Sequence, residues 1–160
     1  SPNIDESVIQ NENPREYVKR MASAKADAAK QSGKYLLAAD TAVVCGTRIL
    51  PKAETEDAAV DCLSLLSGRR HKVFGSICLL LPNGERRIRL VETTVSFKRL
   101  TESEIESYLS SSEWDGKAGG YAIQGRAASF VKHISGSYSN VVGLPLYNVS
   151  QLLRGNGYLW

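Results

Sequence analysis

Hydrophobic residues recur at helical spacing in four stretches of the chain, and each stretch has recognisable boundary signals. The clearest start is Asn13-Pro14-Arg15-Glu16, where Asn13 can cap the helix, Pro14 suits the first turn and Glu16 completes a capping box. A second capping box stands at Thr101-Glu102-Ser103-Glu104. The predicted helices are residues 14–31 followed by Gly33, residues 54–66 closed by Gly68, a helix from Thr101 that includes Ile105, Tyr108 and Leu109, and residues 145–155 ending at Gly155.

Short β-rich runs lie between these helices. Tyr35 to Ala39 is predicted as a buried strand that ends at Asp40. The runs 72–81 and 86–97 flank Pro82-Asn83-Gly84-Glu85, and the Asn-Gly pair favours a hairpin with a type I′ turn. A smaller hairpin around Gly46-Thr47 and a strand over residues 127–134 complete the set. Because strands and helices mix without strict alternation, the pattern predicts an α/β fold with a mixed sheet and helices on its faces.

Composition narrows the class of protein further. A chain of 160 residues with 42% hydrophobic and 23% charged residues is typical of one globular domain. The net charge of +3 permits anionic ligands without requiring nucleic acid. The longest apolar run, residues 77–81, is too short to cross a membrane. Three cysteines without CxxC spacing predict neither a zinc site nor a disulfide framework, and they favour reduced thiols in a cytoplasmic protein.

The segment Lys117-Ala118-Gly119-Gly120-Tyr121-Ala122-Ile123-Gln124-Gly125 is the strongest candidate for a binding loop. Its small residues indicate that backbone comes close to something, because glycines cost chain entropy that only such a need explains. Lys117 can pair with a phosphate, and Gln124 can both donate to and accept from the edge of a base. The alternative is a tight surface loop with incidental polar residues.

Asp40 and Lys52 are candidates because of their positions. Asp40 is expected at the carboxyl end of a strand, where it could bind a divalent cation or accept a proton from water. Lys52 precedes a helix N-terminus, a placement that is favourable when an anion binds there. A turn-forming aspartate and a solvated lysine are the alternatives.

Other polar residues carry less information on their own. Asp5 and Glu6 form a carboxylate pair, Lys25 lies within the first predicted helix, and neither histidine has metal-ligand spacing. The basic clusters 69–72 and 86–89 flank one hairpin. They could contact RNA, but such clusters more often lie on strand faces that are exposed to solvent. No P-loop, GxSxG or HExxH motif is present in the sequence.

Taken in order, these segments resemble the Maf family of nucleoside triphosphate pyrophosphatases. The matching segments are residues 4–6 (Ile-Asp-Glu), 14–18, 24–26, 39–43 (Ala-Asp-Thr-Ala-Val), 49–52, 66–73, the loop 117–125, and 136–146 (Gly-Ser-Tyr-Ser-Asn-Val-Val-Gly-Leu-Pro-Leu). They extend over nearly the whole chain, and the last two are long and specific. The Ala-Asp-Thr motif and the 117–125 loop look like the branch that acts on dTTP and UTP. The branch that acts on 7-methyl-GTP is the alternative.

The resemblance implies a fold and a reaction. The fold is a two-lobed α/β architecture with a central cleft around an extended mixed sheet, like that of inosine triphosphatase. The reaction is hydrolysis between the α and β phosphates of a nucleoside triphosphate, with a divalent metal, magnesium or manganese. The family also suggests a homodimer. The cysteines, the mild net charge and the short apolar runs described above predict a cytoplasmic protein with neither a nucleic acid nor a membrane as partner.

The resemblance also assigns roles to single residues. Asp40 would activate water, and Glu6 with Asp40 would hold the metal. Lys25, Lys52 and Lys117 would neutralise the phosphates, next to Thr41. Gln124 would contact the base or orient the nucleotide. The site residues implied are catalytic Asp40, Lys52 and Gln124, substrate-binding Lys25, Thr41 and Lys117, and the metal ligands Glu6 and Asp40.

The family pattern opens with a strand and a Ser-x-Ser-Pro-Arg-Arg loop before its Ile-Asp-Glu segment. That segment is residues 4–6 here. The expectation is therefore a single Maf-like domain over residues 1–160 without that strand, loop and first helix. Because the loop arginines would contact the triphosphate, a module that binds nucleotides or a protein without turnover is the alternative from another functional class.

Overall fold

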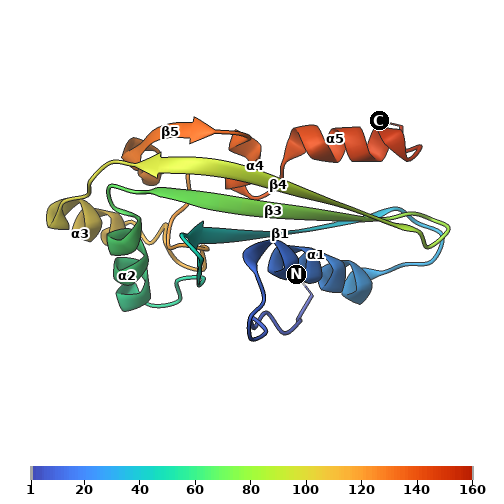
Figure 1. Cartoon of the computed structure of the whole chain (residues 1–160), viewed down its shortest axis with the longest axis horizontal. Coiled ribbons are helices and arrows are strands. Elements are labelled where there is room, and N and C mark those ends of the chain that lie inside the picture. The colour runs from blue at the N-terminus through green and yellow to red at the C-terminus, as the bar shows by residue number, and fades with distance from the viewer. Residues whose placement is uncertain (1, 160) are drawn as a thin grey trace.

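The computed structural model describes residues 2–159 and has a long five-stranded sheet at its centre, in the order β2-β1-β3-β4-β5 (Figure 1). All neighbouring strands in it are antiparallel. The strands are β1 (Leu36–Cys45), β2 (Arg48–Leu50), β3 (Arg70–Leu80), β4 (Arg86–Phe97) and β5 (Val131–Ser135). The α/β class is confirmed, but the pairing among the described strands is not mixed as expected. Hairpins join β1 to β2 and β3 to β4, and such short connections allow only antiparallel neighbours.

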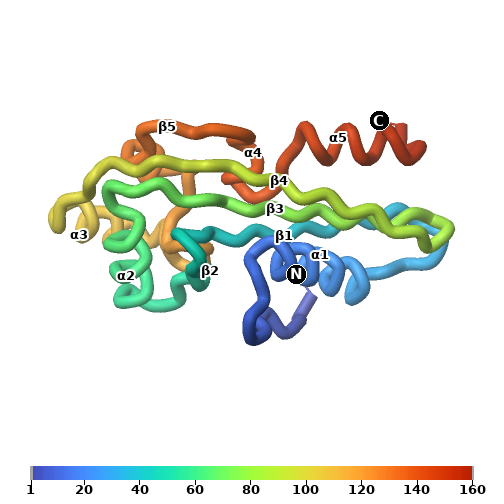
Figure 2. The backbone as a smooth tube through the Cα atoms, in the orientation of Figure 1, coloured from blue at the N-terminus to red at the C-terminus, as the bar shows by residue number. Residues whose placement is uncertain are grey.

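Helices cover both faces of the sheet and one of its ends (Figures 1 and 2). The elements are α1 (Pro14–Ala29), α2 (Glu56–Leu66), α3 (Glu102–Ser110), the 3₁₀ helix η1 (Arg126–Phe130), α4 (Tyr138–Val142) and α5 (Leu146–Gly155). Helix α1 packs on one face through Val18, Ala22 and Ala26. On the opposite face, α5 packs through Val149 and Leu152. The fold therefore contains separate apolar clusters on the two sides of one sheet.

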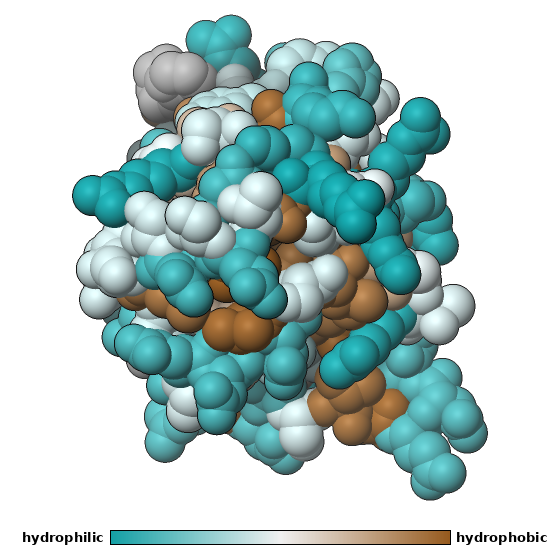
Figure 3. All heavy atoms as spheres, turned by 90° about the vertical axis from the view of Figure 1, so that its left-hand side faces the viewer, coloured by the Kyte–Doolittle hydropathy of each residue, from teal (hydrophilic) through white to brown (hydrophobic). Residues whose placement is uncertain are grey.

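The largest apolar cluster lies at the end of the sheet where α2 and α3 sit. There Val95 and Phe97 of β4 meet Leu63 and Leu66 of α2 and Tyr108 of α3. Figure 3 looks onto this end, whose surface is mainly hydrophilic with hydrophobic atoms visible between the polar side chains. This cluster supports the segment that follows α3, which includes the predicted binding loop.

The predicted N-terminal caps at Asn13 and Thr101 are confirmed. The Asn13 side chain accepts a hydrogen bond from the Glu16 amide at 3.0 Å, and Thr101 and Glu104 form the reciprocal capping box. Helix α2 begins two residues later than expected, because Thr55 serves as its cap. These signals are local, so sequence reasoning could identify them without knowledge of the tertiary structure.

Three strand predictions need correction. Strand β1 continues through Asp40 to Cys45, so Asp40 lies in mid-strand and not at a strand end. The β3–β4 turn is not type I′, since that turn needs positive φ at both central residues and only Gly84 has one (φ 87°). The segment 127–134 begins as η1 and becomes strand only at Val131. For Asp40, a lysine on α1 makes a buried carboxylate tolerable within a strand. The β3–β4 turn is instead closed locally, by a hydrogen bond from the Gly84 amide to the Leu81 carbonyl at 2.9 Å.

Candidate active site

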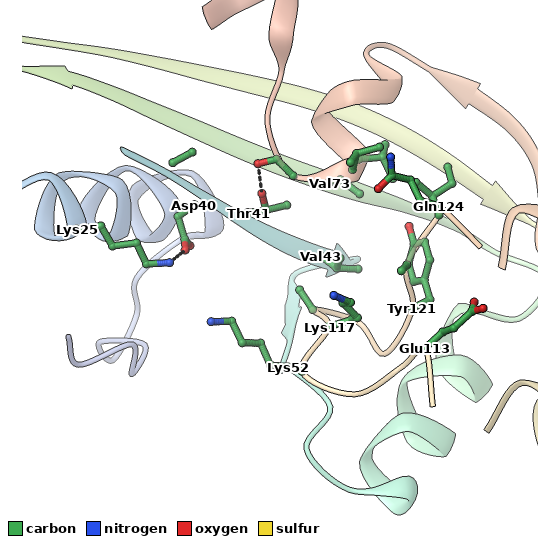
Figure 4. A pocket seen from close by; sticks show the side chains of 18 residues that line it. Lys25, Asp40, Thr41, Val43, Lys52, Val73, Glu113, Lys117, Tyr121 and Gln124 are labelled. Atoms are coloured by element: carbon green, nitrogen blue, oxygen red, sulfur yellow. Dashed lines mark hydrogen bonds and ion pairs between the residues drawn. The ribbon is translucent and has the colours of Figure 1, made fainter. Parts of the chain in front are cut away.

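A cleft of about 500 Å³ lies beside β1 and is closed on its other side by the segment that follows α3 and by α4 (Figure 4). Six of the residues predicted from the sequence line it: Lys25, Asp40, Thr41, Lys52, Lys117 and Gln124. Glu6 lines an adjoining depression that shares Asp40, Thr41 and Lys52 with the cleft. The structure thus brings together all seven predicted site residues, although they are spread over nearly 120 positions of the chain. Their chemical roles stay predictions.

Asp40 is the most buried charged group of the cleft, with 9% of its surface exposed. The Lys25 ammonium of α1 binds Asp40 Oδ1 and lies 3.4 Å from Glu6 Oε1. Glu6 in turn accepts a hydrogen bond from Lys52 Nζ at 2.6 Å. Two carboxylates and two ammonium groups therefore form one chain of ion pairs along this wall, and Lys25 links the two carboxylates.

Burial and ion pairing pull the pKa values of these groups in different directions. Burial raises the pKa of Asp40, although the bond from Lys25 opposes that shift. For Glu6, the hydrogen bond from Lys52 lowers the pKa. Burial acts to lower the pKa of Lys25, but Asp40 and Glu6 outweigh it and the net shift is upward. Lys25 is therefore charged at neutral pH. Of the two carboxylates that it contacts, Asp40 takes up a proton more readily than Glu6.

The opposite wall is the predicted loop, and its backbone is tied to the end of β2. The Ala53 amide donates to the Lys117 carbonyl at 3.0 Å, and the Gly119 amide donates to the Pro51 carbonyl at 3.1 Å. A Cβ on Gly119 would lie 2.8 Å from Val43 Cγ1, at a φ of +70°. The close approach predicted from the glycines is real, but at Gly119 the partner is the protein's own strand β1. Only glycine, which has no Cβ, fits at this position.

Aromatic residues hold the middle of this loop. The Tyr121 hydroxyl lies 2.6 Å from His71 Nε2, and the Ala122 amide donates to the Tyr108 hydroxyl at 3.1 Å. His71 is 2% exposed, and burial lowers its pKa to about 4, so it is neutral at physiological pH. Tyr121 itself lines the cleft. The loop is therefore prebuilt by the protein interior, while Lys117 and Gln124 remain exposed on it.

Val141 and Val142 of helix α4, with Gly143 just after it, close the cleft, and the buried Asn140 fixes the helix to the sheet. Asn140 Nδ2 lies 3.1 Å from the Val73 carbonyl and 3.0 Å from Thr93 Oγ1. Thr41 Oγ1 lies 3.4 Å from the Gly143 carbonyl. Sequence reasoning missed Asn140, His71 and Tyr121 as supports of the site. All three stand within the motif segments 66–73, 117–125 and 136–146, which was the available signal.

The residues present suit a divalent cation only as partial ligands. Among the described residues, no group of three or more His, Cys, Asp or Glu side chains could enclose a metal ion. Glu6 and Asp40 are nevertheless two carboxylates that share one cation, the Lys25 ammonium. Magnesium is commonly held by one or two carboxylates together with substrate phosphates and water. Glu6 and Asp40 could therefore supply two of the ligands of a magnesium or manganese ion, but not all of them.

Comparison with known proteins agrees with this geometry. The model of a family described as Maf-like protein matches residues 1–156. The chain belongs to the Maf family. Proteins named dTTP/UTP pyrophosphatase from Rhodopseudomonas palustris (strain BisB5), Mesorhizobium japonicum and Paramagnetospirillum magneticum are each 55% identical to it over 97% of this chain. The matches cover 79%, 78% and 83% of those Maf proteins.

The Maf family match extends over the sequence segments that suggested the resemblance. It covers both long motifs that suggested the resemblance, including the loop 117–125 and the segment 136–146. Within the described residues, no helix of this Maf protein is long and apolar enough to cross a membrane.

Proposed function

We propose that this chain hydrolyses dTTP and UTP between the α and β phosphates, giving the nucleoside monophosphate and pyrophosphate. The observation that carries the proposal is the convergence of Lys25, Lys52 and Lys117 with Asp40 in one cleft. Three ammonium groups around a buried carboxylate suit a polyphosphate next to a base that activates water. The names of the 55%-identical relatives support the choice of dTTP and UTP.

Each cleft residue has a role in this reaction. Asp40 accepts a proton from the attacking water, and its burial keeps the carboxylate away from bulk solvent. The lysines neutralise the phosphate charge as the pyrophosphate leaves, with Thr41 beside them. Gln124 lies further along the cleft from Asp40 (Figure 4), where it can contact the base or orient the nucleotide. Positioning and charge stabilisation supply most of the rate.

Glu6 and Asp40 would hold the metal ion, which we propose to be magnesium or manganese. When bound, it would supply charge neutralisation to the phosphates. Lys25 forms ion pairs with both of these carboxylates, and its ammonium would turn toward the phosphates of a bound nucleotide.

A direct assay tests the reaction. The protein is incubated with dTTP, UTP, 7-methyl-GTP or CTP, with magnesium, with manganese or with EDTA, and pyrophosphate release is measured. We expect release from dTTP and UTP that EDTA abolishes. Nucleotide binding by calorimetry without pyrophosphate would overturn the proposal in favour of a non-catalytic module. Faster release from 7-methyl-GTP than from dTTP and UTP would assign the chain to the 7-methyl-GTP branch of the family.

We further propose a cytoplasmic homodimer whose partners include neither nucleic acid nor membrane. Reduced thiols suit the cytoplasm, and Cys45, Cys62 and Cys78 are all free and buried. Tyr138, Leu146 and Tyr147 are large exposed residues near one another in sequence, which supports a contact between subunits. Sedimentation equilibrium checks the dimer, and a strictly monomeric protein would exclude it.

A further inference from the structure

Ser76 lies directly opposite the proposed water-activating carboxylate. In the β1–β3 ladder, Asp40 pairs with Ser76. On β3 its neighbours two positions away, Phe74 and Cys78, both pack under α1, so the Ser76 side chain faces α1 as well. The same argument places Asp40 on that face, between Ala38 and Ala42. Residues opposite each other on one face of an antiparallel pair have Cβ atoms about 4.5–5.5 Å apart, which is within reach of a hydrogen bond after a side-chain rotation.

The Ser76 hydroxyl has no hydrogen-bond partner within residues 2–159, although it is completely buried. A buried hydroxyl without a partner destabilises the protein, because it loses its bond to water and gains nothing in return. Alanine would fill almost the same space without that cost. A buried hydroxyl without a partner in a native structure calls for an explanation.

The ion pairs around Asp40 point to such an explanation. The Lys25 ammonium binds Asp40 Oδ1. Lys25 also lines the cleft, where a triphosphate would compete for its charge. When the ammonium turns toward the phosphates, Asp40 loses the hydrogen bond that Lys25 donates, and a metal ion held by Asp40 would donate none in its place. A hydroxyl directly across the ladder can then donate to the carboxylate.

We propose that Ser76 is a positioning residue, whose hydroxyl donates a hydrogen bond to Asp40 once substrate draws Lys25 away. The inference rests on the proposed pyrophosphatase function. The bond holds the carboxylate in the orientation in which it accepts a proton from water. Ser76 touches neither substrate nor water and acts only through Asp40.

The variant Ser76→Ala separates this role from a structural one. Removal of an unsatisfied hydroxyl raises the melting temperature of the ligand-free protein by about 2–4 °C. Loss of the bond to Asp40 lowers kcat on the order of 10-fold with KM nearly unchanged, because an essential group is less well held. Opposite signs for stability and kcat are the result expected. Unchanged kcat overturns the proposal, and so does a melting temperature that falls together with kcat.

A matched control places a hydroxyl two residues further along the same face. Cys78→Ser has Ala38 across the ladder in place of a carboxylate. It should lower the melting temperature and leave kcat unchanged, and a kcat loss equal to that of Ser76→Ala would overturn the proposal. The wild-type assay separates this inference from the proposed function. No pyrophosphate from wild type removes the function, whereas an active wild type with fully active Ser76→Ala removes only the role of Ser76.

Discussion

The two walls of the cleft hold their polar side chains by different means. On the β1 wall, Lys25, Asp40, Glu6 and Lys52 are held by ion pairs with one another. On the loop wall, main-chain hydrogen bonds and the Tyr121–His71 contact fix the backbone, and Lys117 extends from it into the cleft. Ion pairs can exchange partners with a charged ligand, whereas main-chain bonds and buried rings cannot. The β1 wall is therefore the adaptable one, and the loop wall is the preformed one.

The largest effect on stability is expected within the β1 wall. Lys25→Met leaves Asp40 buried without its cation and should lower the free energy of unfolding by about 3 kcal/mol. Lys52→Met removes a similar ion pair whose side chains are 46% and 35% exposed, so its cost should stay below about 1 kcal/mol. Urea denaturation of both variants measures the difference. Equal costs would show that burial does not distinguish these two pairs.

Acid should weaken the loop wall through His71. Its pKa is about 4 in the folded protein, against 6.5 for an unperturbed histidine, so the unfolded chain binds the proton more readily. Its neutral form therefore contributes stability that is present above pH 6.5 and lost as the pH falls toward 4, amounting to about 2 kcal/mol at pH 5 and about 3 kcal/mol at pH 4. Urea denaturation from pH 7.5 to 4 measures this loss. The variant His71→Phe keeps a ring beside Phe97 and Tyr121 but has no group to protonate. Its loss of stability between pH 7.5 and 4 should be smaller than that of the wild type by the His71 contribution. The same loss in both proteins would contradict the prediction.

For the chemical role of the β1 wall, Asp40→Asn is the decisive variant. It keeps the shape of the side chain but removes the proton acceptor, so kcat for dTTP should fall by about 10²-fold. Asp27→Asn is the control, because Asp27 is an exposed carboxylate of α1 paired with Arg86 outside the cleft. Steady-state assays compare the two. Retention of full activity by Asp40→Asn would remove Asp40 from the catalytic group.

Because the loop wall is rigid, a substitution in it should lower the stability of the protein, by less than Lys25→Met does. Gly119→Ala adds a clash with Val43 to the strain of a positive φ, and we expect a cost of about 2 kcal/mol or more. Gly33→Ala is the matched control, since Gly33 has a φ of +72° and nothing within 4 Å of the added Cβ. It should cost only about 1 kcal/mol from strain. Thermal denaturation measures both, and equal losses would mean that the loop yields at Val43.

Much of this molecule followed from its amino-acid sequence alone. The caps at Asn13 and Thr101 and the β3–β4 hairpin depend on residues a few positions apart, so local reasoning found them. The family motifs named all seven candidate site residues for the same reason: each motif is a short string of residues.

Only the tertiary structure decided which of these residues touch. The bond from Lys25 to Asp40, the contact of His71 with Tyr121 and the place of Ser76 across from Asp40 join positions 15, 50 and 36 residues apart. No local pattern encodes such contacts, because they depend on strand register and on how α1 packs against the sheet. The same packing explains why β1 continues through Asp40, since a lysine from another element compensates the buried charge.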